Sequence, residues 1–308
     1  MSNKIVVIGS SNTDMIVQTP HIPRPGETIL GGTFNTAAGG KGANQAVSCA
    51  RAGGAVTFVA RVGKDMFGDQ ALQGFQKDGI NTEYVVTDAE APSGVALIIV
   101  DDQGENSIAV ASGANGNLSV ADVQAAETTI GDAGIVLMQL EVPLETVEAA
   151  ATLAQAHQAQ VILNPAPAQP LSVALLRQVA ILTPNETEAQ MLTGIDVQDE
   201  DSAQQAAQAL CAKGVGSVII TLGAAGAYVY ADAFKGMVSG FKVTPVDTTA
   251  AGDTFNGTLA VALAQGDTLE QAVSFANAAA ALSVTKLGAQ PSAPDRETID
   301  RFVKEYQG

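Results

Sequence analysis

The chain is poor in basic residues, histidine and tryptophan, and these shortages exclude several classes of function. It has 308 residues with 15 Lys and Arg against 32 Asp and Glu, so its net charge at pH 7 is −17. Nucleic acids and anionic membranes are bound by clustered positive charge, so neither partner is expected. Tryptophan is missing, the only histidines are His21 and His157, and no G-x-S-x-G motif occurs, which disfavours a histidine-dependent hydrolase.

Cysteine and long apolar runs are scarce as well. Cys49 and Cys211 form no C-x-x-C pair, so neither a disulfide framework nor a zinc site is expected, and buried free thiols in a reducing cytosol fit better. The apolar run Ile5 to Ile8 is too short for a signal peptide, and no run approaches the ~18 residues of a membrane span. We therefore expect a soluble, cytoplasmic protein.

Two common nucleotide-binding signatures are also lacking. The positions five residues before Gly40-Lys41 and Gly63-Lys64 hold Asn35 and Phe58, so no G-x-x-x-x-G-K-[ST] loop exists. No G-x-G-x-x-G follows the first strand-like run either. A Walker-type NTPase and a nicotinamide-binding Rossmann unit are therefore disfavoured.

What the sequence does contain is an alternation of short apolar runs and amphipathic helical stretches, typical of a parallel sheet covered by helices on both faces. The clearest runs are Ala55 to Val62, Ile135 to Leu140, Val161 to Leu163, Val179 to Leu182 and Ser217 to Ile220. We predict a single α/β domain over residues 1–308. Residues 15–37 and 93–111, the latter a hairpin around Asp102-Gln103-Gly104, have strand-like pieces without helices and predict a small second sheet.

Residues 246–257 carry the most functional information. An apolar run from Phe241 to Val246 predicts a strand, and apolar residues recur every four positions from Phe255 until Gly266, which predicts a helix. The segment between them is then a strand-to-helix turn.

The small residues of that turn, Ala250, Ala251 and Gly252, leave the N–H groups at the helix start uncovered. A helix start of this kind favours an anion such as a phosphoryl group. Asp253 follows at once, and a carboxylate there can take the proton from a hydroxyl that attacks phosphorus. The alternative is that Asp253 only caps the helix.

Four further motifs accompany this turn: Gly9 to Asp14, the Gly-rich turn Ala38 to Ala46, Asn185 to Glu188, and Thr221 to Gly226. In this order and at these separations the motifs resemble the ribokinase-like carbohydrate kinase family, from about Ile5 to about Ser292. The resemblance implies a Rossmann-like fold in which the small sheet is a lid over the sugar and forms a homodimer contact.

The resemblance also implies where the sugar binds. Carboxylates and carboxamides at the ends of apolar runs suit hydroxyl groups, although Asp14 could instead be a turn residue and Lys41 could instead meet the transferring phosphate. The implied substrate-binding residues are Asn12, Asp14, Gly40, Lys41, Gly42, Asn44, Glu141 and Asp253.

For ATP and magnesium, the resemblance implies the Asn-x-x-Glu motif and the glycine-rich turn. Asn185 and Glu188 also have the spacing of a helix capping box, and the glycines of the turn could simply join two strands. The implied nucleotide-binding residues are Asn185, Glu188, Thr221, Leu222, Gly223, Ala224, Ala225, Gly226, Gly252 and Asn277.

A potassium site is implied by the resemblance alone. Its ligands would be a carboxylate and loop oxygens of the following residues: Asp247, Thr249, Ser283, Lys286, Gly288 and Ser292.

The implied activity is ATP-dependent phosphorylation of a sugar, first of all D-ribose at its 5-hydroxyl. The catalytic group would be Asp253 with the nest of Ala250, Ala251 and Gly252. 2-Deoxyribose, fructose and nucleosides remain alternative substrates, and a non-catalytic sugar or nucleotide sensor on the same fold remains a rival, although a sensor has no need of a base at Asp253.

Overall fold

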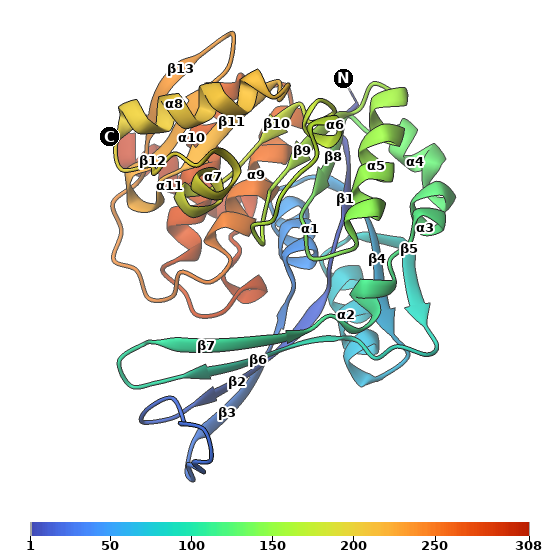
Figure 1. The fold of residues 1–308 in the computed structure, drawn as a ribbon, viewed down its shortest axis with the longest axis vertical. Coiled ribbons are helices and arrows are strands. Elements are labelled where there is room, and N and C mark those ends of the chain that lie inside the picture. Colours follow the sequence, from blue (N-terminus) through green and yellow to red (C-terminus); the bar gives the residue numbers. More distant parts are fainter. Residues whose placement is uncertain (1, 308) are drawn as a thin grey trace.

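A nine-stranded sheet forms the centre of the computed structural model, which describes residues 2–307, so the two ends of the predicted 1–308 domain lie outside it (Figure 1). Seven strands from β11 to β5 run parallel, and β12 and β13 are antiparallel additions at one edge. In sheet order they are β13 (Lys235–Ser239), β12 (Gly226–Tyr230), β11 (Ser217–Thr221), β10 (Ile181–Leu182), β9 (Gln160–Leu163), β8 (Ile135–Met138), β1 (Lys4–Ile8), β4 (Ala55–Gly63) and β5 (Asn81–Asp88).

The sheet is buried on both faces because its strands are apolar at successive positions. In β1, Ile5 and Val7 belong to one core cluster together with Leu259, whereas Val6 and Ile8 belong to the cluster on the other side. The helices are α1 (Lys41–Arg51), α2 (Met66–Lys77), α3 (Val120–Ala125), α4 (Glu127–Gly131), α5 (Leu144–Ala156), α6 (Val173–Leu176), α7 (Glu186–Thr193), α8 (Glu200–Ala212), α9 (Ala251–Ala264), α10 (Leu269–Ser283) and α11 (Arg296–Gln307), with 3-10 turns η1 (Gly113–Asn117), η2 (Gly223–Ala225) and η3 (Gln290–Ser292). The predicted fold class is confirmed.

A separate four-stranded sheet projects from the main body, at the bottom of Figure 1. Its order is β3 (Thr33–Gly39), β2 (Asn12–Gln18), β6 (Gly94–Val100) and β7 (Asn106–Ala111). The predicted hairpin is the β6–β7 connection, and β2 begins at Asn12 rather than at Met15. Every residue of β7 is exposed.

One predicted strand is wrong. β13 ends at Ser239, and residues 240–249 reach α9 as a loop. Pro245 has no N–H to donate to a neighbouring strand. The N–H groups of Val246 and Asp247 both donate to the carbonyl of Val284, just after α10, at 2.7 and 3.1 Å. The loop is therefore tied to a helix end, and α9 follows a loop and not a strand.

Within residues 2–307, no helix combines the length and the apolar character that crossing a membrane requires.

Candidate active site

The turn from β3 into α1 brings the N-terminal sugar-site candidates together. Gly40 has φ of +89°, and a Cβ there would lie 2.6 Å from the backbone nitrogen of Asn12, so only glycine fits. The carboxylate of Glu141 accepts hydrogen bonds from the Lys41 N–H at 3.0 Å and from the Ser10 hydroxyl. Glu141, which follows β8 in the chain, thus fixes the start of α1.

Asp253 lies in the first turn of α9 and is 6 % exposed. Its Oδ2 accepts from Nδ2 of Asn44 and its Oδ1 from Nε2 of Gln45, both at 2.9 Å. The residue at the N-cap is Ala250, and no side chain caps this helix. The capping alternative for Asp253 is therefore wrong, because its carboxylate is directed to α1.

The charged side chains at this site shift one another's pKa values. Burial raises the pKa of Asp253, and Glu141 adds to this, while Lys41 and the Asn44 and Gln45 amides act in the opposite direction. Burial would lower the pKa of Lys41, but attraction by nearby carboxylates, above all Asp253, outweighs it and raises that pKa. A charged lysine thus faces a carboxylate whose pKa is raised, which makes that carboxylate a stronger base.

Asp14 joins the same cluster from β2. Burial, with repulsion from Glu141 and Asp253, raises the pKa of Asp14 to about 6. Strand alternation places Asn12 and Asp14 on one face of the small sheet.

One buried acceptor in this cluster lacks a partner. Because Asn44 uses its Nδ2 on Asp253, its Oδ1 remains, and this oxygen is buried without a hydrogen bond. A buried acceptor left unpaired is costly. A hydroxyl group from a bound molecule would satisfy it, which fits a polyhydroxylated ligand between Asp14 and Asp253.

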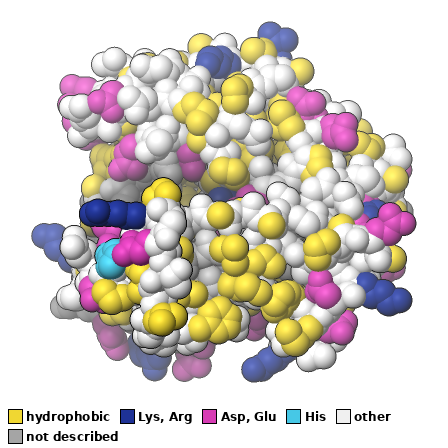
Figure 2. All heavy atoms as spheres, turned by 60° about the horizontal axis from the view of Figure 1, so that its bottom comes forward, with side chains coloured by type: hydrophobic (Ala, Val, Ile, Leu, Met, Phe, Trp, Pro, Cys, Tyr) yellow, Lys and Arg dark blue, Asp and Glu magenta, His cyan; other side chains and the backbone are white. Residues whose placement is uncertain are grey.

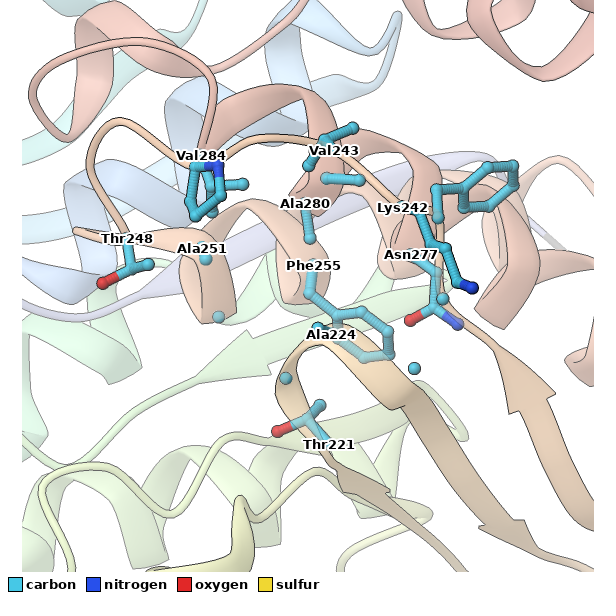
Figure 3. A pocket seen from close by; sticks show the side chains of 17 residues that line it. Thr221, Ala224, Lys242, Val243, Thr248, Ala251, Phe255, Asn277, Ala280 and Val284 are labelled. Carbon is cyan, nitrogen blue, oxygen red and sulfur yellow. The ribbon is translucent and has the colours of Figure 1, made fainter. Parts of the chain in front are cut away.

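A cavity of about 560 Å³ lies beyond Asp253, on the side of β11 and β12. Figure 3 shows Thr221 and Ala224 on one side of it, Ala251 and Phe255 of α9 behind, and Asn277 of α10 at one end. Its walls are mainly apolar, which suits a planar base.

Four of the six residues predicted between Thr221 and Gly226 line this cavity, namely Thr221, Gly223, Ala224 and Gly226. Leu222 packs instead against the hydrophobic core, and Ala225 is not among the lining residues. The glycines also join two antiparallel strands, so the same turn can connect β11 to β12 and line the cavity.

The cavity reaches the start of α9, where Ala251 and Gly252 line it. Ala250 has φ of +58°, an uncommon conformation for a residue with a side chain. A Cβ at Gly252 would meet no atom within 4 Å, so the space in front of this helix start is open. Unpaired N–H groups of the first turn make such a space suitable for a phosphoryl group.

The Asn-x-x-Glu motif lies against the same turn. Asn185 forms a β-bridge with Thr221, and its side chain and that of Glu188 form the predicted capping box at the start of α7. Glu188 is 8 % exposed, and burial, with repulsion from Asp253, raises its pKa. A cation near these carboxylates would relieve the repulsion.

The loop residues of the predicted potassium site are also connected. The carboxylate of Asp247 accepts from the N–H of Thr249 at 2.9 Å and from that of Gly288 at 2.8 Å. The carbonyl of Ser283 accepts from the Lys286 N–H, and Ser292 ends η3 in the same loop. Within residues 2–307, no group of three or more His, Cys, Asp or Glu side chains could hold a metal, so a cation here would depend largely on carbonyl and hydroxyl oxygens.

The sequence did not predict three buried amides near the site: Gln45, Gln139 and Asn164. Gln45 donates to Asn164 Oδ1 as well as to Asp253, and accepts from Gln139. Their partners are far apart in sequence, and the only signal was the position of Gln45 next to Asn44 on a helix.

Residues 2–296 match the profile described as pfkB family carbohydrate kinase. The chain is 45 % identical over 304 residues to a ribokinase of Haemophilus influenzae, covering 99 % of both chains. It is 38 % identical to a deoxyribokinase of Salmonella typhi, covering 97 % of this chain and 98 % of that one. A structure of Arabidopsis thaliana ribokinase complexed with ribose and ATP superimposes with a TM-score of 0.91 at 35 % identity, covering 99 % of each chain.

Proposed function

Because the chain belongs to the pfkB family of carbohydrate kinases, we propose that it transfers the γ-phosphoryl group of ATP to the 5-hydroxyl of D-ribose. The products are ribose 5-phosphate and ADP. The observation that carries this proposal is the position of Asp253: its buried carboxylate belongs to the polar cluster suited to hydroxyls, and the residue before it, Gly252, lines the cavity suited to a nucleotide. The similarity to Arabidopsis thaliana ribokinase, whose structure is complexed with ribose and ATP, supports ribose as the first candidate substrate.

In this mechanism Asp253 accepts the proton of the attacking hydroxyl, and Ala251 and Gly252 direct backbone N–H groups at the transferring phosphoryl group. Lys41, held in its charged form by Asp253 and neighbouring carboxylates, balances the negative charge that develops there. Asn12, Asp14, Asn44 and Glu141 then orient the sugar. Gly40 and Gly42 allow the close approach of the backbone.

ATP occupies the 560 Å³ cavity in this proposal, with the base between the β11–β12 turn and Asn277. Magnesium accompanies it and neutralises phosphate charge when bound. Asn185 and Glu188 would reach it, directly or through water, because Glu188 is a buried carboxylate next to Thr221 through the Asn185 bridge.

A potassium ion at the Asp247 loop is also part of the proposal. The loop from Asp247 leads directly into the strained Ala250 at the start of α9. Oxygens of Thr249, Ser283, Lys286, Gly288 and Ser292 would complete the site. An ion there would keep the backbone N–H groups of residues 250–252 in position without taking part in phosphoryl transfer.

We therefore expect potassium to raise the turnover rate several-fold over the rate in tetramethylammonium at equal ionic strength and fixed magnesium. Sodium should do this poorly. The measurement is steady-state kinetics at saturating ATP, and equal rates in all three salts would remove the ion from the account.

The substrate is tested by magnesium-dependent ADP formation across ribose, 2-deoxyribose, fructose and a nucleoside. Ribose should give the highest kcat/KM. A clear preference for 2-deoxyribose would support the alternative suggested by the deoxyribokinase similarity. ATP binding without turnover on any sugar would instead favour a sensor.

The small sheet is proposed to act as a lid and to form a homodimer. Exposed apolar side chains support this, since Phe34, Leu97, Ile108 and Val110 are each more than half exposed on these strands. Figure 2, which brings the bottom of the Figure 1 view forward, shows hydrophobic side chains gathered on this side. Strand pairing places Ile108 and Val110 on one face of this sheet and Phe34 and Leu97 on the other. A second copy that covers the face with Ile108 and Val110 would remove these two side chains from water. Light scattering should give a mass near twice 31.2 kDa, and Ile108→Lys should lower it.

The proposed location is the cytoplasm. Cys49 and Cys211 are free thiols, as expected in a reducing compartment. ATP, the proposed phosphoryl donor, is available in the cytoplasm.

A further inference from the structure

Asn115 is a buried carboxamide that touches both the β1–β2 connection and a proposed sugar ligand. It lies in η1, just after β7, and is 1 % exposed. Its Nδ2 donates to the carbonyl of Ser11 at 3.1 Å and to Oδ1 of Asn12 at 2.7 Å. Its Oδ1 accepts from the N–H of Ser11 at 2.8 Å.

The backbone of Ser11 fixes which way this amide faces. A backbone N–H can only donate and a carbonyl can only accept, so the Oδ1 of Asn115 must face the former and its Nδ2 the latter. The remaining hydrogen of Nδ2 points to Asn12. The Asn12 atom that receives it must therefore be the oxygen, and the Asn12 Nδ2 is the end left for a ligand.

The contact between the Asn115 and Asn12 amides requires a glycine at position 94. Gly94 starts β6 and pairs with Asn12. A Cβ on Gly94 would lie 2.2 Å from Nδ2 of Asn115 and 2.2 Å from Oδ1 of Asn12. Any side chain at position 94 would break the hydrogen bond between Asn115 and Asn12. The glycine at this position is therefore needed for that hydrogen bond.

We propose that Asn115 is a positioning residue for sugar recognition that acts through Asn12. It holds Asn12 as a hydrogen-bond donor beside Asp14, which is an acceptor on the same face of β2. A hydroxyl both donates and accepts, so one sugar hydroxyl can give its proton to Asp14 and receive one from Asn12. A sugar that lacks this hydroxyl leaves both Asp14 and Asn12 without a hydrogen-bond partner. These two residues would therefore discriminate against such a sugar. The inference rests on the proposed sugar site.

Asn115→Asp tests this arrangement with little change in volume. The new carboxylate still accepts from the Ser11 N–H but cannot donate to Asn12 or to the Ser11 carbonyl. The Asn12 amide should then turn to donate to it, presenting its oxygen to the sugar next to the acceptor Asp14. The KM for ribose should rise about 10- to 100-fold, while kcat and the KM for ATP stay within about three-fold. Asn117→Ala, on the same 3-10 turn but exposed, should leave all three constants unchanged.

A double-mutant cycle separates an effect through Asn12 from a general loosening of the β1–β2 connection. In an Asn12→Ala background, Asn115→Asp should no longer change the KM for ribose. An equal effect of Asn115→Asp in both backgrounds would overturn the inference while leaving the sugar site intact. An unchanged KM for ribose in Asn12→Ala alone would show instead that the proposed sugar site is wrong, and the inference would fall with it.

Gly94→Ala gives a second route to the same contact if Asn115→Asp does not fold. The added methyl group must displace Asn115 or Asn12. It should raise the KM for ribose in the parent and have no further effect in the Asn12→Ala background. A KM for ribose that matches the parent, with the protein folded as judged by circular dichroism, would contradict the proposal.

Discussion

Asp253→Asn is expected to lower kcat about 10²-fold or more, with the KM for ATP nearly unchanged. Among the described residues, the side chains hydrogen-bonded to this carboxylate are the amides of Asn44 and Gln45, and neither amide can accept the proton in its place. Loss of a general base is typically worth 10²- to 10⁴-fold. Steady-state and single-turnover kinetics at saturating sugar and ATP measure the effect.

Folding should survive this change for a structural reason. Asparagine at this position would direct one N–H toward Asn44, whose Oδ1 lacks a partner and can turn to accept it. Asp253→Ala serves as a second variant that avoids the question of amide orientation. Turnover within a few-fold of the parent in both variants would exclude Asp253 as the base.

The second large effect concerns Asp14. Asp14→Ala should reduce kcat/KM for ribose roughly 10- to 150-fold, because a hydrogen bond to a charged group contributes about 1.5–3 kcal/mol. Binding of ATP should be unaffected, since Asp14 lies on β2 while the proposed nucleotide cavity is lined from β11, α9 and α10. The parent's preference for ribose over 2-deoxyribose should also shrink if the lost partner is the 2-hydroxyl.

The pH dependence gives an independent check on this role. The pKa of Asp14 in the free enzyme is raised to about 6. Above this pH the side chain is an ionised acceptor, and below it the protonated carboxyl accepts poorly. The advantage of the parent over Asp14→Ala in kcat/KM for ribose should therefore be largest above pH 6 and shrink as the pH falls through 6. A constant ratio from pH 5 to 8, or a defect confined to the KM for ATP, would contradict the assignment.

Local patterns predicted the layered fold and the glycine-rich turns, whereas the roles of most candidate site residues followed only from the family resemblance. Runs apolar at successive positions identified the parallel strands, because burial on both faces leaves that signature. The breaks of this pattern at residues 15–37 and 93–111 predicted the small sheet. In contrast, the apolar run Phe241 to Val246 predicts a strand, but the N–H of Val246 donates to the carbonyl of Val284 after α10 and the N–H of Lys242 donates to the Tyr306 hydroxyl. Periodicity reports burial and cannot say which group accepts a hydrogen bond.

The amides around the site could not be predicted for a related reason. Gln45 meets Asp253 across 208 positions, and Asn115 meets Ser11 across 104. Neither glutamine nor asparagine carries a periodic or charge signal that marks such a partner. Their roles depend on orientation, which only the backbone groups and carboxylates facing them determine.

Identification of the product tests the central claim most directly. With ribose, ATP and magnesium, the account predicts one ADP per sugar phosphate and a phosphorus–carbon coupling at C5 in the ¹³C spectrum of the product. The rate of its formation should depend on Asp253. ATP hydrolysis without a sugar phosphate, or phosphate attached at another carbon of ribose, would contradict the account.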